Sequence, residues 1–455
     1  MTPLTPISVA DDDLALLTDL YELTMLQAYW HQGMRERSVF SLYFRHLPPN
    51  RRFMLACGQQ YAAELATRLH FSDSAIERLA DTGLFRDGFL QWLSHYRFRG
   101  DIWTLPEGTP VFPNEPLMEV EAPVAEAQLL ESLIMNQVQL ETVLASKAVR
   151  LVMAAEGRPV VDFGMRRMHG VDAAVRGVRA YRTAGIAGTS NVLGGLRYDL
   201  PLRGTMAHSY VLAHDDEREA FQRFAELYPG TTLLVDTHDT LDGVRKVIAL
   251  KDAHPDLEIG AIRLDSGDLG DLARRSRQLL DDAGYQQIRI VASSGLDEYQ
   301  IQTLVRQGAP IDIFGVGTEM GASTDAPVLD LSYKLVEYAG KPRVKHSPGK
   351  VNLAGRKQVY RQCDANGEFT GDVIARREEY IKEGTPLLAH TIVNGEVDSA
   401  HIATLDQARD QACRSISLLP ATMRELTSED DGRSSDDYPV TLSQALQQLQ
   451  QDECA

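Results

Sequence analysis

A repeated alternation of short apolar stretches and amphipathic helices fills residues 158 to 317 and constrains the fold more than any other feature. Each apolar stretch has the length of a strand, and the segments between them repeat Leu, Ile or Val at helical spacing, which is typical of parallel βα units. Seven such stretches predict an α/β fold built on a βα barrel. The predicted strands are 158–163, 184–188, 202–207, 231–236, 259–264, 288–293 and 311–317.

An open, doubly wound sheet is the alternative architecture for the same pattern. Such a sheet commonly carries a GxGxxG sequence after its first strand, where a dinucleotide binds. No GxGxxG opens a helix after 158–163. The barrel is therefore favoured over the open sheet.

The segments that flank the repeated units have a different pattern. Residues 16–30 repeat apolar residues as a helix does, and residues 38–47 alternate as a strand does. The acidic, serine-rich stretch 427–437 is typical of a solvated loop. We expect three parts, which are an N-terminal α+β domain over 1–125, a catalytic barrel over 126–330 and a C-terminal extension over 331–455.

Polar residues follow nearly every predicted strand. In βα barrels the chemistry collects at the carboxyl ends of the strands, because the loops there converge on one mouth. Each polar residue also has an ordinary explanation, since Asp239 or Asp297 can cap a helix, a glycine can permit a turn, and a histidine can be structural. Seven polar strand ends in succession favour a functional site. They read FGMRRMHG, GTSN, GTMAHS, VDTHDT, RLDSGDL, SSGLDE and GVGTE.

These strand ends suggest phosphate and sugar binding. The backbone N–H groups of glycine-rich ends, such as those at Gly295 and Gly317, can hold a phosphate without net positive charge. Arginines supply local cations, carboxylates suit Mg²⁺ or sugar hydroxyls, and His208 supplies a nucleophilic nitrogen. The arginines are Arg166, Arg167 and Arg263, and the carboxylates are Asp236, Asp239, Asp265 and Asp268.

Aldolase chemistry is a rival for a barrel, but it requires a Schiff-base lysine at a strand end. Lys246 and Lys251 instead fall in a predicted helix and in the loop after it. The sequence therefore disfavours an aldolase.

The charge balance excludes other classes of function. The chain has 46 basic and 64 acidic residues, a net charge of -18, which repels nucleic acid and anionic lipid. The four cysteines have no CxxC spacing and fit free thiols in a reducing compartment. No charged signal-peptide start and no apolar run of membrane-spanning length is present. We expect a cytoplasmic protein with neither nucleic-acid nor membrane partners.

Seven motifs together resemble the nicotinate phosphoribosyltransferase family, and the similarity runs from about residue 14 to the region of Tyr438. Those motifs are LLTDLYELTM, DFGMRRMHGVDAA, GTSNVLGG, GTMAHS, IRLDSGDL, FGVGTEM and GRKQVYR. The resemblance implies an irregular βα barrel of the type II phosphoribosyltransferase kind, assembled as a homodimer with shared active sites. It also implies condensation of nicotinate with phosphoribosyl pyrophosphate to nicotinate mononucleotide and pyrophosphate in NAD salvage, with Mg²⁺ and coupled to ATP hydrolysis.

The resemblance further implies roles for individual residues. His208 is similar to the histidine that ATP phosphorylates, and Asp236 matches the carboxylate that orients it. Asp265 lies where the family binds ribose or Mg²⁺, directly or through water. Tyr21 resembles the aromatic residue that the partner subunit donates, stacking the pyridine against Phe163.

Other positions match contacts to the substrates. Thr205 and Arg263 match positions that contact nicotinate, and Arg166 is similar to the arginine beside the ring and pyrophosphate. Gly317 and Thr318 match the ribose phosphate site, to which we add the glycine-rich end at Gly295.

The chain differs from the usual family sequence at two positions. His238 stands where the family usually has Tyr, which leaves the packing around Asp236 open, and Gly177 interrupts a predicted helix.

Three alternative functions are considered. Nicotinamide phosphoribosyltransferase carries an acid where this chain has Ser190, and such an acid would repel nicotinate. Quinolinate phosphoribosyltransferase is much shorter and would need a more basic pocket. A non-catalytic binding module would have lost His208, Arg263 or Asp265, and all three are present.

Overall fold

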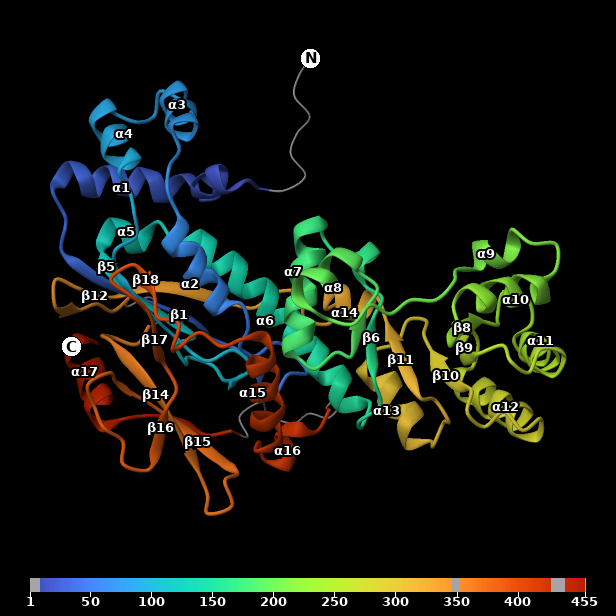
Figure 1. Cartoon of the computed structure of the whole chain (residues 1–455). Coiled ribbons are helices and arrows are strands. Elements are labelled where there is room, and N and C mark those ends of the chain that lie inside the picture. The colour runs from blue at the N-terminus through green and yellow to red at the C-terminus, as the bar shows by residue number, and fades with distance from the viewer. Residues whose placement is uncertain (1–8, 346–351, 427–437, 455) are drawn as a thin grey trace. The chain divides into compact units, whose positions relative to one another are not determined.

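The computed structural model describes residues 9–345, 352–426 and 438–454, so the predicted acidic loop at 427–437 lies outside the described residues. The chain divides into two compact units (Figure 1). One comprises Met1–Ser146 with Ala326–Ala455, and the other is Lys147–Asp325. The chain passes from the first unit to the second within one long helix, α6 (Glu131–Ala154).

The second unit is built on one sheet of six parallel strands, in the order β7-β6-β11-β10-β9-β8 (Figure 1). The end strands β7 and β8 are not paired with each other, so the sheet is a half-barrel. The predicted irregular βα barrel is confirmed in this form. The strands are β6 (Val160–Asp162), β7 (Gly188–Thr189), β8 (Thr231–Leu234), β9 (Ile259–Leu264), β10 (Arg289–Ala292) and β11 (Ile313–Val316).

The predicted strand 202–207 is wrong, and the predicted strand 184–188 overlaps β7 only at Gly188. Residues 202–207 form a single bridge, between Leu202 and Thr189, and no named strand. The neighbouring strand β7 is two residues long and offers little backbone for pairing. Pro201 has no N–H to donate, and Gly204 is exposed.

Side-chain caps start most of the longer helices that follow the strands. The carboxylates of Asp239, Asp268 and Asp297 each accept a backbone N–H at the start of their helices. Their ordinary role as caps is therefore the observed one. The helices of this unit are α7 (Val171–Thr183), α8 (Val192–Tyr198), α9 (His208–Leu212), α10 (Glu217–Leu227), α11 (Thr240–Ala253), α12 (Leu269–Asp282), α13 (Glu298–Arg306) and α14 (Thr318–Ala322).

Two further predictions concern residues in these helices. Helix α7 continues through Gly177, which is buried, so the glycine does not end it. Both Lys246 and Lys251 lie inside α11, and the second is not in the following loop as predicted. Neither lysine is at a strand end.

The first unit packs helices against an antiparallel sheet in the order β13-β12-β1-β5-β3-β17-β18. Strand β1, predicted at 38–47, is Arg37–Phe44 and lies inside this sheet. The other strands are β3 (Asp101–Thr104), β5 (Met118–Pro123), β12 (Leu331–Tyr338), β13 (Lys341–Pro342), β17 (Ala389–Val393) and β18 (Glu396–Val397). The helices over residues 9–146 are α1 (Leu20–Gln32), α2 (Gln59–Arg68), α3 (Asp73–Asp81), α4 (Asp87–Ser94), α5 (Val124–Gln128) and the start of α6.

Segments from both ends of the chain complete this unit. A second sheet has the order β16-β14-β15-β19, and β2 (Met54–Leu55) pairs with β4 (Pro110–Val111). The strands of the second sheet are β14 (Lys357–Cys363), β15 (Phe369–Arg376), β16 (Gly384–Pro386) and β19 (Val440–Leu442), and the helices are α15 (Leu405–Ser417), α16 (Ala421–Arg424) and α17 (Gln444–Cys454). Within the described residues, no helix has the length and apolar character needed to cross a bilayer.

Candidate active site

A pocket of about 500 Å³ in the second unit contains seven of the predicted site residues. They come from loops after strands β6, β7 and β9, from the β9 strand itself and from the segment that leads into α9. The carboxyl ends of parallel strands meet at one edge of a sheet, which explains why residues far apart in sequence converge. The seven are Phe163, Arg166, Ser190, Thr205, His208, Arg263 and Asp265.

The guanidinium of Arg263 is the centre of the hydrogen bonds in this pocket. Its Nε donates to Ser293 Oγ at 2.8 Å, and its Nη1 donates to Thr205 Oγ1 at 3.1 Å. Its Nη2 donates to Asp265 Oδ1 at 2.7 Å. The guanidinium carbon also lies 5.3 Å from the centroid of the Phe163 ring. These bonds use three of five N–H donors, so two remain for a planar anion.

Asp265 and Asp236 form a linked pair of carboxylates. Asp265 Oδ1 also accepts from the Ser293 hydroxyl, and the Asp265 backbone N–H donates to Asp236 Oδ2 at 2.9 Å. The hydroxyl of Ser266 donates to the same Asp236 oxygen at 2.6 Å. Asp236 is buried, and its Oδ1 has no hydrogen-bond partner among the residues that the structure describes. A buried carboxylate oxygen without a donor is a position where a cation or an ordered water fits.

His208 is the first residue of α9, and its side chain is 43% exposed. Its Nδ1 lies 3.1 Å from Thr237 Oγ1, and its Nε2 lies 3.9 Å from Asp265 Oδ2. The predicted contact of this ring with Asp236 is therefore replaced by one with Thr237. The reason is that Asp236 turns toward Asp265 and Ser266 instead. The side chain of His238, whose effect on the packing around Asp236 was not predicted, is exposed.

Phe163 forms the aromatic wall of the pocket. It follows β6 directly, and the absence of a side chain at Gly315 makes room for it, since a Cβ there would come within 2.5 Å of the ring. Arg166 and Ser190 also line the pocket and are exposed. The pocket thus combines a flat apolar surface with a polar rim.

The predicted phosphate-binding residues lie outside this lining. Gly295 has φ of 59° and follows Ser294, whose φ of 95° is also positive, directly after β10 and Ser293. Gly317 precedes Thr318, the first residue of α14, and both follow β11. Their role in holding a phosphate stays a prediction.

Comparison with known proteins decides the family. The model of the nicotinate phosphoribosyltransferase N-terminal domain matches residues 16–139, and that of the nicotinate phosphoribosyltransferase family matches residues 159–350. The nicotinate phosphoribosyltransferase pncB2 of Mycobacterium tuberculosis is 49% identical over 433 residues, which cover 95% of this chain and 92% of that protein. This chain belongs to the nicotinate phosphoribosyltransferase family.

Other nicotinate phosphoribosyltransferases are also similar to it. That of Bacillus subtilis is 40% identical over 383 residues, covering 82% of this chain and 78% of the relative. The crystal structure of the human nicotinic acid phosphoribosyltransferase matches with a TM-score of 0.83 at 26% identity, covering 96% of this chain and all of the other (100%). The family's fold therefore extends over nearly the whole chain.

Tyr21, the remaining residue predicted from the family, belongs to the first unit. It lies in the first turn of α1 and is 46% exposed. Burial of part of the phenol and the neighbouring Glu131 and Glu22 carboxylates raise the pKa of Tyr21. Burial and the Glu131 carboxylate also raise the pKa of Glu22 to about 7. Glu22 and Glu131 thus form an acidic cluster beside Tyr21, and part of the Tyr21 side chain remains accessible.

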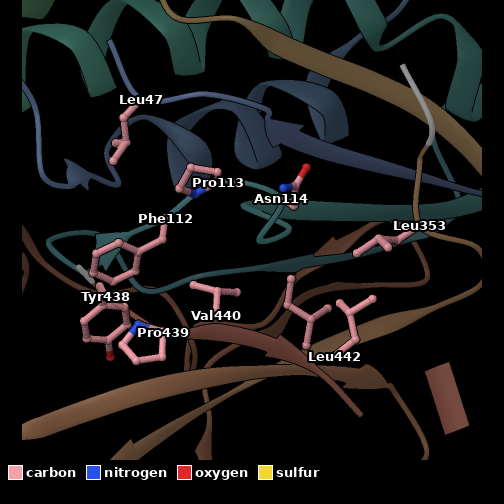
Figure 2. Close-up of a pocket in the computed structure, with 10 residues that line it drawn as sticks. Leu47, Phe112, Pro113, Asn114, Leu353, Tyr438, Pro439, Val440 and Leu442 are labelled. Carbon is pink, nitrogen blue, oxygen red and sulfur yellow. The ribbon is translucent and has the colours of Figure 1, made fainter. Parts of the chain in front are cut away.

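A second pocket, of about 490 Å³, lies in the first unit between the segment after β4 and the edge of β19 (Figure 2). The rings of Phe112 and Tyr438 stack at one end of it, with centroids 3.8 Å apart. Its lining consists of apolar side chains apart from Asn114 and the Tyr438 hydroxyl. None of the described residues that line this pocket is charged, so none of them supplies a cation for a phosphate.

Sequence reasoning missed two residues of the site. Ser293 connects Arg263 with Asp265, and Thr237 contacts the ring of His208. Both stand at predicted strand ends, in SSGLDE and VDTHDT. That position was the one feature of the sequence that could have indicated a role in the site. Serine and threonine are so common at turns and helix starts that their type alone does not single them out.

Proposed function

We propose that this chain transfers the phosphoribosyl group of phosphoribosyl pyrophosphate to nicotinate, giving nicotinate mononucleotide and pyrophosphate for NAD salvage. The arrangement that carries the proposal is the Arg263 guanidinium, which lies over the Phe163 ring and is bonded to Asp265. It places a carboxylate-binding cation, an aromatic surface and an acid for the sugar in one pocket.

The pyridine ring of nicotinate fits against Phe163 in this proposal. Its carboxylate meets the two unused N–H donors of Arg263, with the Thr205 hydroxyl beside them. Ser190 adds a neutral rim, which an anionic substrate tolerates better than an acid.

The sugar substrate occupies the carboxylate side of the pocket. Asp265, with its Oδ2 facing His208, and the unpartnered Oδ1 of Asp236 are suited to ribose hydroxyls or to Mg²⁺. Among the described residues, no cluster of three or more metal-ligating side chains exists. Mg²⁺ commonly binds through one or two carboxylates together with substrate phosphates and water, so we propose that these two acids hold it only when the sugar substrate is bound. Arg166 would contact pyrophosphate, and Gly295, Gly317 and Thr318 would hold the ribose phosphate.

The reaction forms a bond between the pyridine nitrogen and C1 of the ribose while the bond from C1 to the pyrophosphate oxygen breaks. The bonding electrons leave with pyrophosphate, whose charge Mg²⁺ would neutralise. The pyridine nitrogen has a free lone pair, so a general base is unnecessary. The residues of the chain mainly hold the ring and C1 within reach of each other.

ATP coupling is assigned to His208 in this proposal. Transfer of the γ-phosphoryl group of ATP to a ring nitrogen would give a phosphohistidine and ADP. Because Nε2 is 3.9 Å from Asp265, the added negative charge would arise beside the sugar site. It can change affinity for the sugar substrate without taking part in the displacement.

A homodimer with shared sites is the proposed assembly. The start of the α1 region exposes three apolar side chains, Leu17, Leu20 and Tyr21. A second exposed apolar face lies on α8, directly after the pocket residue Ser190, and consists of Val192, Leu193 and Leu196. Burying such faces between subunits is favourable. The four cysteines are free, which supports our proposal of a reducing, cytoplasmic location. The net charge of -18 supports our proposal that the enzyme has neither nucleic-acid nor membrane partners.

The test is product formation by the purified protein. With phosphoribosyl pyrophosphate and Mg²⁺ present, nicotinate, nicotinamide or quinolinate is supplied separately, and mononucleotide and pyrophosphate are quantified. We expect equimolar nicotinate mononucleotide and pyrophosphate from nicotinate. Faster turnover of nicotinamide or quinolinate would contradict the proposal, and no turnover of any pyridine would indicate a binding module.

A further inference from the structure

Asp162 is a buried acid directly behind the pocket that the proposed reaction does not use. It ends β6, is 1% exposed and does not line the pocket. Its Oδ1 accepts the backbone N–H of Gly164 at 2.7 Å, and its Oδ2 accepts the hydroxyl of Thr189 at 2.6 Å. Both partners are neutral, so neither of them supplies a positive charge to offset the cost of burying this carboxylate. Burial accordingly raises the pKa of Asp162.

The two partners of Asp162 belong to two different loops of the pocket. Gly164 lies between Phe163 and Arg166, and Thr189 precedes Ser190. The backbone oxygen of Asp162 also accepts the N–H of Ser190 at 2.9 Å. One residue therefore holds the aromatic wall and the neutral rim of the pocket in a fixed relationship.

Thr189 accepts one hydrogen bond and donates another. The N–H of Asn191 donates to Thr189 Oγ1 at 3.0 Å, and the Thr189 hydroxyl donates onward to Asp162. The Asn191 side chain links the same loop to two helices. Its Oδ1 accepts the N–H of Gly194 at the start of α8, and its Nδ2 donates to the backbone oxygen of Ala174 in α7. Thr189 can accept one bond and donate another because Asp162 offers an oxygen with no proton of its own.

We propose that Asp162 is a positioning residue that sets the selectivity of the pocket for a pyridine carboxylate, acting through Thr189 on the loop of Ser190 and through Gly164 on that of Phe163. This rests on the proposed function. Asparagine at 162 would direct an N–H at Thr189 Oγ1, which already accepts from Asn191, so the hydroxyl would lose its acceptor. The loops would then lose their fixed spacing. Nicotinate, which depends on charged contacts of defined geometry, would lose more than nicotinamide.

The test compares Asp162→Asn, Thr189→Val and their double variant with Thr189→Ser, which keeps the hydroxyl. Thr183→Val is the matched control, because Thr183 is equally buried but donates only to the backbone of its own helix. Steady-state kinetics are measured for nicotinate, nicotinamide and phosphoribosyl pyrophosphate, with melting temperatures of every variant.

We expect Asp162→Asn and Thr189→Val each to raise the KM for nicotinate about tenfold or more, and to lower the ratio of kcat/KM for nicotinate over nicotinamide similarly. The KM for phosphoribosyl pyrophosphate should change less than about threefold. The double variant should be no worse than the more impaired single variant, because both break the same bond. Thr189→Ser should keep the wild-type ratio, and Thr183→Val should lower stability without changing that ratio.

Several outcomes overturn the inference. These are an unchanged ratio in folded Thr189→Val, parallel increases of both KM values, or additive losses in the double variant. Thr189→Val and Thr189→Ser decide the matter if Asp162→Asn does not fold. A wild-type chain that turns over no nicotinate contradicts the proposed function and the inference together. An active wild type whose selectivity survives both substitutions contradicts the inference alone.

Discussion

Arg263 Nη2 donates to Asp265 Oδ1 at 2.7 Å, so the cation proposed for the pyridine carboxylate and the acid proposed for the sugar form one ion pair. Ser293 bonds to both members of this pair and is 2% exposed. The two halves of the pocket are therefore not independent. A change at their shared contact should affect the binding of both substrates.

Removal of the Ser293 hydroxyl tests this connection. Ser293→Ala leaves Arg263 Nε without an acceptor and frees Asp265 Oδ1 from one donor, which costs about 1–3 kcal/mol in a buried site. We expect kcat/KM for both substrates to fall about tenfold, measured by initial rates. Ser276→Ala is the control, since Ser276 is fully buried on α12 and its hydroxyl has no hydrogen-bond partner within the described part of the chain. Equal kinetics of Ser293→Ala and wild type would refute the role.

The convergence of the pocket residues was predictable, whereas their individual contacts were not. Parallel strands place their carboxyl ends at one edge, so the polar ends that contain Phe163, Ser190 and Arg263 had to lie close together. The partner of His208 depends on which way adjacent side chains turn, and Asp236 turns toward the Asp265 backbone. Sequence spacing cannot distinguish Asp236 from Thr237, because both stand at the end of one strand.

The fold was predictable to a similar degree. Five predicted strands form largely as expected, because their runs of buried apolar residues suit a parallel sheet that is covered on both faces. Residues 202–207 have a similar composition but only a two-residue strand, β7, beside them. Strand formation there depends on a neighbour that local sequence does not describe.

A shared active site predicts complementation between two inactive chains. Tyr21→Ala should remove the ring contact that one subunit donates, and Asp265→Ala should remove the sugar contact in the other. Mixing equal amounts of the two should restore about a quarter of wild-type activity after subunit exchange, because about half of the dimers are hybrids and each hybrid has one intact site of two. No recovery after exchange, verified by native mass spectrometry, would mean that each site is built from one chain.

The acidic cluster beside Tyr21 predicts a pH dependence of stability. Burial and Glu131 raise the pKa of Glu22 from 4.5 to about 7, so the folded state binds a proton more tightly than the unfolded state. The contribution of Glu22 to stability is therefore present below pH 4.5 and is lost as pH rises to about 7.

Glu22→Gln should remove that part of the dependence. We expect its melting temperature to exceed that of the wild type at pH 8 and to approach it below pH 4.5, measured by calorimetry. Glu77→Gln, at an exposed glutamate on α3, should follow the wild-type curve. A Glu22→Gln curve parallel to that of the wild type would mean that another group causes the pH dependence.

Phosphorylation of His208 predicts a specific chemical label. Incubation with γ-labelled ATP should give an acid-labile, base-stable linkage, and His208→Ala should abolish it. The variant should retain slow transfer without ATP, because the phosphoryl group changes affinity and does not attack the ribose. His214→Ala is the control, since its ring contacts the Tyr210 backbone on the same helical segment. Undiminished labelling of His208→Ala would refute the assignment.

The most direct test of the central claim is the selectivity of the wild-type chain between the acid and the amide of the same ring. The measurement is kcat/KM for nicotinate and for nicotinamide at saturating phosphoribosyl pyrophosphate and Mg²⁺, repeated with Arg263→Lys. Loss of a charged partner at a partly buried arginine costs on the order of 3 kcal/mol, so nicotinate should be preferred at least about a hundredfold. Arg263→Lys keeps the charge but loses the planar fork, and should lose most of that preference. Comparable turnover of both pyridines by the wild type would contradict a pocket built to bind a pyridine carboxylate.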